Sequence, residues 1–233
     1  MRVLARKKIV FVIVEGPSDQ DALELLLNKI FDRDRVFVHV TYGDITSRAG
    51  NTPANILKKV QAEVGKYAKN NHFEKSHFKE VIHIIDTDGT YVSEDRVIED
   101  ETVGKTIYSP DSITARDKQS IVERNLSKRK NVDKLQTTPL IWGKIPYSVY
   151  YMSCNLDHVL YNKQNSSDEE KENDSFEFAR KYKSDTDGFK RFISASDFSV
   201  GGDYQSSWEY IKEGKHSLER HTNLGLCFPD SER

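Results

Sequence analysis

Four short apolar runs set the order of elements along this chain. The first, residues 8–14, consists mostly of β-branched residues; it is too short to cross a bilayer and is typical of a strand buried on both faces. Gly16 and Pro17 end it abruptly, and Ser18 or Asp19 can cap the helix that follows. Three further runs predict strands at 35–42, 80–85 and 146–152.

Apolar residues recur at intervals of three and four between these runs, which is the spacing of a helix with one buried face. Leu23, Leu26 and Leu27 share such a face and predict a helix over 19–32. Pro53 opens a second predicted helix that runs to about residue 70. This alternation predicts an α/β fold, with a Rossmann-like, mainly parallel sheet of about four strands flanked by helices.

The rest of the chain follows a different pattern. Residues 91–143 are rich in charge and have no apolar run, and one helix is predicted around 112–135, so we interpret this segment as a helical insertion. The predicted core then spans 1–162, and 163–233 is a helical C-terminal extension that starts with a polar linker or helix start. Amphipathic helices are predicted in it near 176–182, 188–195 and 204–212.

The composition of the chain indicates what kind of surface it has and where it is located in the cell. Hydrophobic residues make up 36% and charged residues 31%, which predicts long polar surface segments, and the net charge of −2 gives no overall attraction to nucleic acid. Any such binding therefore needs a local basic patch. The two cysteines have no C-x-x-C spacing, which favours a reducing, cytoplasmic location. No stretch is long enough to span a membrane, and we interpret the basic N-terminus with its following run as a strand rather than a signal peptide.

Acidic residues follow three of the four predicted strands: Glu15 and Asp19 the first, Asp86 and Asp88 the third, and Asp157 the fourth. The carboxyl ends of parallel strands meet at one edge of the sheet, where these carboxylates would repel each other unless a cation neutralised them. Carboxylate oxygens are the ligands that Mg²⁺ or Mn²⁺ prefers. Each acid alone is an ordinary turn or capping residue, but three convergent sites favour a metal centre.

These residues resemble the motifs of the Toprim domain, which is shared by topoisomerases, primases and several nucleases. The resemblance rests on Val14-Glu15-Gly16 with Asp19, and on Asp86-x-Asp88-Gly89, and it covers 8–90 and, in outline, 146–162. It implies that Asp86 and Asp88 bind metal and that Glu15 is a ligand or general acid/base. Asp19 and Asp157 match further acids of the nuclease branches, although glutamate is more usual at the latter place.

The resemblance implies a Mg²⁺- or Mn²⁺-dependent nuclease that cuts phosphodiester bonds of DNA or RNA. The small phage-defence proteins of the RloB type and the OLD-type nucleases are the branches it is most similar to. OLD-type proteins often carry an ATPase, and we expect any ATP dependence here to require a separate ATPase or another defence-system partner.

Two other functions are open. Residues 84–90, IIDTDGT, also resemble the first motif of haloacid dehalogenase-type phosphatases, with Asp86 as nucleophile, Asp88 as general acid and Ser153 in the second motif. That motif usually opens its domain, whereas here two strands and two helices precede it, and Glu15 is left without a role. The other possibility is a non-catalytic Toprim scaffold that binds nucleic acid or a partner protein.

Basic residues gather in the predicted insertion helix and are the candidate contacts to nucleic-acid phosphates. Acidic residues are interleaved with them, so they could equally form a solvated helix face. Lys190 and Arg191 are a second candidate cation pair. The candidate patch consists of Arg116, Lys118, Arg124, Lys128, Arg129, Lys130 and Lys134.

Overall fold

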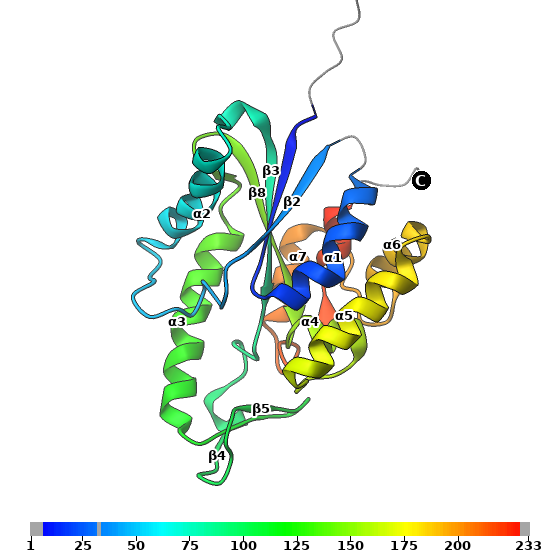
Figure 1. Ribbon diagram of the computed structural model, residues 1–233. Helices are drawn as coiled ribbons and strands as arrows, with labels where there is room; N and C mark the ends of the chain where they lie inside the picture. Colours follow the sequence, from blue (N-terminus) through cyan, green and yellow to red (C-terminus); the bar gives the residue numbers. More distant parts are fainter. Residues whose placement is uncertain (1–6, 32–33, 229–233) are drawn as a thin grey trace, which may run out of the picture.

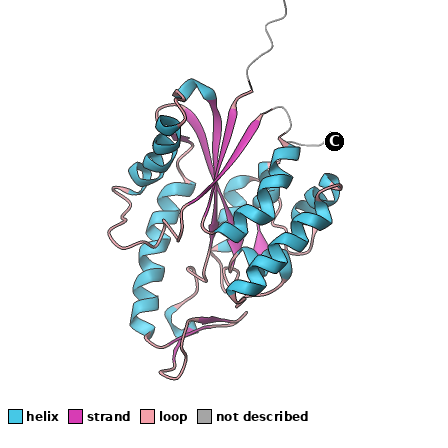
Figure 2. Cartoon of the chain, in the orientation of Figure 1, coloured by secondary structure: helices cyan, strands magenta, loops and turns pink. Residues whose placement is uncertain are grey.

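The structure is a computed structural model that describes residues 7–31 and 34–228. A sheet whose strands fan out runs through its centre, with helices on both sides (Figures 1 and 2). Strands β2, β1, β3 and β8 lie in this order and pair parallel, while β7 and β9 pair antiparallel to β8. The fold is therefore α/β with a mixed sheet. The strands are β1 (Ile9–Val14), β2 (Arg35–Val40), β3 (Phe78–Asp86), β7 (Leu140–Ile141), β8 (Ile145–Ser153) and β9 (His221–Thr222).

Alternating side chains of β1 divide the core into two layers, as expected for a strand buried on both faces. Val10, Val12 and Val14 pack with α1 (Pro17–Ile30), α4 (Leu156–Tyr161), α5 (Asp168–Tyr182) and α6 (Thr186–Ala195). Ile9, Phe11 and Ile13 pack with α2 (Ile56–Asn70), α3 (Lys118–Gln136) and α7 (Tyr204–Ile211). None of the helices in the described ranges is long and apolar enough to cross a membrane.

The four predicted strands are confirmed, with one informative difference in length. The prediction extended the second strand to Tyr42, but β2 ends at Val40. The amide (3.0 Å) and the hydroxyl (3.2 Å) of Thr41 both donate hydrogen bonds to the carbonyl of Val14. Tyr42 then adopts a positive φ of 52°. A left-handed residue cannot continue a strand, so the chain turns away at the edge of the sheet.

The predicted helical insertion is only partly helical. Besides α3 it contains a small sheet of three strands in the order β4–β6–β5, and these strands are β4 (Val97–Glu99), β5 (Ile107–Tyr108) and β6 (Ile113–Ala115). Strands of two or three residues are too short to show a period of two in the sequence, which is why the prediction missed them. Figure 1 shows this sheet at the far end of α3, away from the central sheet.

The three helices predicted after residue 174 are confirmed. α5 begins earlier, in the polar stretch, because Ser167 caps it by accepting a hydrogen bond from the Glu170 amide (3.2 Å). Strand β9, which pairs with β8, was not predicted. The segment before β9 also lies against the turn after β3, since the Thr87 hydroxyl and the Gly89 amide both donate to the carbonyl of Ser217 (2.7 and 3.1 Å). The C-terminal region is thus tied to the same sheet edge as the acids.

Candidate functional site

Five acids lie at the carboxyl ends of the parallel strands, and we call them the acid edge: Glu15, Asp19, Asp86, Asp88 and Asp157. Glu15 directly follows β1 and Asp86 ends β3. The Asp86 amide donates to Glu15 Oε1 (3.3 Å), and Asp86 Oδ1 accepts from the Leu156 amide (3.0 Å) at the start of α4. These two bonds link the ends of β1 and β3 to the helix after β8, which is the convergence that the sequence predicted.

Asp19 and Asp157 complete the edge from the first turns of two helices. Asp19 Oδ2 accepts from the Gly16 amide (2.9 Å), so this carboxylate caps α1 and faces the strand end. Asp157 lies in the first turn of α4, and Lys171 of α5 brings its Nζ to 3.5 Å from Asp157 Oδ2. Lys171 thus supplies a partly exposed positive charge at this side of the edge.

Desolvation, and after it the charges of neighbouring acids, raises the pKa of Glu15, Asp86 and Asp19. Burial, followed by the charge of Asp44 and then of Asp88 and Asp19, raises the pKa of Glu15 well above its ordinary value. Burial and then the charge of Glu15 do the same to the pKa of Asp86. Burial also raises the pKa of Asp19 to about 6, with a contribution from Asp157. Neighbouring carboxylates cannot all be ionised at once unless a positive charge lies among them.

The raised pKa of Asp19 predicts a pH dependence of stability in metal-free buffer. Because the folded protein holds the Asp19 proton to about pH 6 and an unfolded chain loses it near pH 4, Asp19 stabilises the fold at low pH. That contribution, on the order of 2–3 kcal/mol, is lost as the pH rises from about 4 to about 6. Urea unfolding across this range should show a smaller loss of stability for Asp19→Asn than for the wild type. Asp21→Asn, an exposed acid of the same helix, is the control and should keep the wild-type slope.

Lys128 is the residue whose position the sequence prediction got wrong. It was predicted as a surface contact to nucleic acid, but its side chain is fully buried, with Nζ 2.5 Å from Asp88 Oδ2 and 2.8 Å from Asp44 Oδ2. Burial opposes the charge of Lys128, but Asp44 and Asp88 raise its pKa well above the ordinary value. Burial likewise disfavours an ionised Asp44, yet the Lys128 ammonium holds the pKa of that carboxyl well below normal. Asp44 comes after β2 as the other acids come after their strands. This position in the sequence could have identified it as a further acid at the same edge of the sheet.

The other residues of the predicted basic patch do not share one face of α3. Arg124 donates to the Asp88 carbonyl (3.0 Å) and to the Tyr108 hydroxyl (2.7 Å), and Arg129 donates to the Thr90 carbonyl (2.8 Å). These two half-buried side chains stabilise the turn after β3. The remaining lysines and arginines of the patch are open to phosphate contacts, and those contacts stay a prediction: Arg116, Lys130 and Lys134 are exposed and Lys118 is half-buried.

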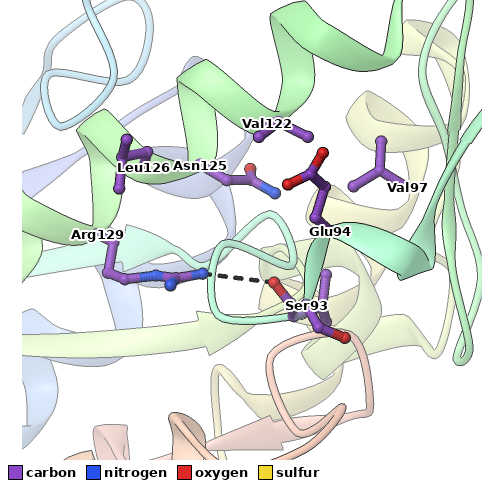
Figure 3. Close-up of a pocket in the computed structure, with 8 residues that line it drawn as sticks. Ser93, Glu94, Val97, Val122, Asn125, Leu126 and Arg129 are labelled. Carbon is purple, nitrogen blue, oxygen red and sulfur yellow. Dashed lines mark hydrogen bonds between the residues drawn. The ribbon is translucent and has the colours of Figure 1, made fainter.

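A pocket of about 250 Å³ lies between α3 and the segment leading into β4 (Figure 3). The Glu94 carboxylate and the Asn125 amide point toward each other within it, and Arg129 donates to the Val92 carbonyl (3.4 Å) at its side. Its lining includes the apolar side chains of Val97, Val122 and Leu126, and no residue of the acid edge. The pocket is therefore separate from the candidate site.

The donor chemistry of the acid edge suits Mg²⁺ or Mn²⁺, because its side chains offer only carboxylate oxygens. Glu15, Asp19 and Asp86 make no ion pair within 4.0 Å in the part of the chain that the structure describes. In residues 7–31 and 34–228, however, no three or more His, Cys, Asp or Glu side chains form a group that could hold a metal ion. The carboxylates thus have the right chemistry but are not gathered as closely as ligands of one ion.

Comparison of the chain with models of protein families, with curated proteins and with solved structures gave no match. The similarity to the Toprim domain consequently stays a prediction from the motifs around Glu15 and Asp86. The role of the acid edge has to be inferred from its own chemistry.

The turn that carries Asp88 depends on Gly89, which has a φ of 65°. A Cβ added there would lie 2.5 Å from Leu218 Cδ2 and 2.9 Å from Ile113 Cδ1. Gly89→Ala should therefore lower the free energy of unfolding by roughly 2–4 kcal/mol, from backbone strain and overpacking together. Gly50 has a φ of 80° with no atom within 4 Å of an added Cβ, so Gly50→Ala is a matched control for strain alone. Urea unfolding measures both, and an equal loss would show that Gly89 is not tightly packed.

Proposed function

We propose that this chain is a Mg²⁺- or Mn²⁺-dependent nuclease with a Toprim-like core that hydrolyses phosphodiester bonds at the acid edge. The observation that carries the proposal is the pair Glu15 and Asp86. Both are partly buried, they are linked through the Asp86 amide, and desolvation together with neighbouring acids raises the pKa of each. Partly buried acids that destabilise one another are typical of sites kept for chemistry rather than for stability.

All five acids are candidate ligands, and Glu15, Asp19 and Asp86, which make no ion pair within the described residues, are the first of them. They would have to move closer together than they lie in the structure to hold one ion. A bound divalent ion would supply positive charge to the phosphoryl oxygens and favour ionisation of an attacking water. Glu15 can also exchange a proton during the reaction, because desolvation and the charge of Asp44 raise its pKa well above that of an ordinary glutamate. Lys128 orients the Asp88 carboxylate by its 2.5 Å contact.

The wider parts of the proposal rest on this chemistry, on the cysteine pattern and on the resemblance of the motifs to the Toprim nucleases. The substrate is DNA or RNA, since a phosphate backbone is what a metal–carboxylate edge acts on, and the exposed basic residues of α3 would contact further phosphates. A cytoplasmic location and a role in phage defence, with a separate ATPase as partner, belong to the same proposal.

The phosphatase alternative finds no support in the contacts of Ser153. In that mechanism the residue would bind the phosphate, but its side chain is buried and its hydroxyl lies 2.7 Å from the carbonyls of both His216 and Glu219. A non-catalytic scaffold could share the same acids, and only an activity measurement separates it from a nuclease.

The test is a cleavage assay on supercoiled plasmid and on structured RNA with Mg²⁺, Mn²⁺ or EDTA. It compares the wild-type protein with Glu15→Gln and Asp86→Ala. We expect metal-dependent cleavage of one substrate class, lost in both variants. Cleavage that persists in the variants would place the activity elsewhere. The absence of metal binding, together with no cleavage of either substrate, would favour the scaffold. Turnover of a phosphate monoester that survives Glu15→Gln but not Asp86→Asn would favour the phosphatase.

A further inference from the structure

Tyr42 stands out on the surface beside the acid edge. Among the exposed large apolar and aromatic side chains of the described chain it has the highest accessibility, 80%, ahead of Phe176 on α5 at 65%. It lies in the loop that follows β2 (Figure 1), and β2 is the neighbour of β1 in the sheet, so the loop starts from the same edge as Glu15.

The loop holds Tyr42 in a fixed place relative to Glu15. On one side of it, the Thr41 amide donates to the Val14 carbonyl (3.0 Å), and on the other the Gly43 amide donates to the Glu15 carbonyl (3.0 Å). Arg48 Nη2 then donates to the Thr41 carbonyl (3.2 Å) and lies 3.5 Å from the Gly43 carbonyl. The backbone on both sides of the tyrosine is therefore tied to the end of β1.

This placement is unfavourable for the isolated protein. The φ of Tyr42 is 52°, a conformation that glycine or asparagine adopts with far less strain than an aromatic residue. The ring makes none of the aromatic or cation–π contacts found in the described chain, whereas Tyr67, for example, stacks on Phe37 with ring centroids 3.9 Å apart. A solvent-exposed aromatic side chain with a strained backbone does not add to the stability of the fold. Residues with a strained backbone are concentrated at functional sites.

We propose that Tyr42 is a stacking platform for an unpaired nucleobase next to the phosphate that the acid edge cleaves. The inference rests on the proposed nuclease function and adds a substrate class, strands with unpaired bases at the cut rather than continuous duplex. Base–aromatic stacking needs a base that has left its neighbours, and every base offers a π face. Arg48 is exposed and contacts the carbonyls on both sides of Tyr42 through Nη2. Its Nε and Nη1 donate none of the described hydrogen bonds, so they can bind the adjoining phosphate.

Binding to fluorescein-labelled single-stranded DNA, single-stranded RNA and blunt duplex tests this proposal. Anisotropy titrations in an Asp86→Asn background avoid cutting during the measurement. Tyr42→Ala should raise the Kd for the preferred single strand roughly 5- to 100-fold and leave the duplex Kd within about twofold. Tyr42→Phe keeps the ring and should stay within about threefold of the parent, because stacking needs no hydroxyl. Phe176→Ala removes another exposed aromatic and should have no effect.

Tyr42→Gly separates the loss of binding from a loss of folding. It relieves the strained φ, so its Tm should rise by roughly 1–4 °C while its single-strand affinity falls as in Tyr42→Ala. An unchanged single-strand Kd for Tyr42→Ala, an equal loss in Tyr42→Phe, or an equal loss on duplex would overturn the stacking role. If wild type cuts nucleic acid and Tyr42→Ala binds it normally, only this inference fails. A wild-type protein that neither binds nor cuts removes the nuclease proposal with it.

Discussion

An Asp86→Asn variant should be more stable than the wild-type protein and yet lose at least about 100-fold in cleavage rate. The side chain of Asp86 is partly buried, and desolvation together with the charges of Glu15, Asp19 and Asp88 raises its pKa. Asparagine keeps the shape and the acceptor for the Leu156 amide, but it removes a charge that the folded state tolerates poorly. We expect the free energy of unfolding at neutral pH without metal to rise, because asparagine carries no charge for desolvation and the neighbouring acids to oppose.

Three measurements on the same preparation check this expectation. Thermal or urea unfolding in EDTA gives the stability, titration with Mn²⁺ gives metal binding, and the plasmid and RNA assays give the rate. Asp21→Asn, the exposed acid on α1, is the control and should change none of them. An Asp86→Asn protein that is less stable and still cuts would show that the acid edge is a structural network rather than a metal centre.

Long elements and the acids that follow them could be predicted from the sequence because the cause is local. β1, β3 and β8 are strands of six to nine residues, and each contains an apolar run that can be recognised on its own. Once these strands pair parallel, Glu15, Asp86 and the start of α4 must meet at one edge. The topology alone therefore brought the predicted acids together.

Lys128, the ion-pair partner of Asp88, could not be predicted as buried, because it lies among many other polar residues of α3. The buried positions of this helix include Asn125, Lys128 and Asn131, so its hydrophobic periodicity does not identify the face that packs inward. Treating every lysine and arginine of α3 as exposed placed Lys128 on the surface. Asp44, 84 positions earlier, meets it only through the tertiary fold. The exposed position of Tyr42 was missed for another reason. Tyrosine favours strands, and Tyr42 ends an apolar run that was predicted to be a strand throughout.

Lys128→Met should be the most destabilising single change at the site, lowering the free energy of unfolding by about 3–5 kcal/mol. Methionine fills similar volume, so the loss comes chiefly from charge. It leaves the carboxylates of Asp44 and Asp88 without the ammonium that lies 2.8 and 2.5 Å from them, next to Glu15 and Asp86, which already repel each other. Urea unfolding with an unchanged m-value measures the effect as a shift of the midpoint.

Two further variants show whether this loss belongs to the ion pair. Lys130→Met, two residues along α3 and exposed, should stay within about 0.5 kcal/mol of wild type. Adding Asp44→Asn to Lys128→Met should recover part of the stability, because removing both charges of a buried pair costs far less than removing one. If Lys128→Met behaves like Lys130→Met, the lysine does not carry a buried charge at the acid edge. If the double variant is worse than the single one, Asp44 stabilises the loop after β2 mainly through its contact with the Thr46 amide (2.6 Å) rather than through Lys128.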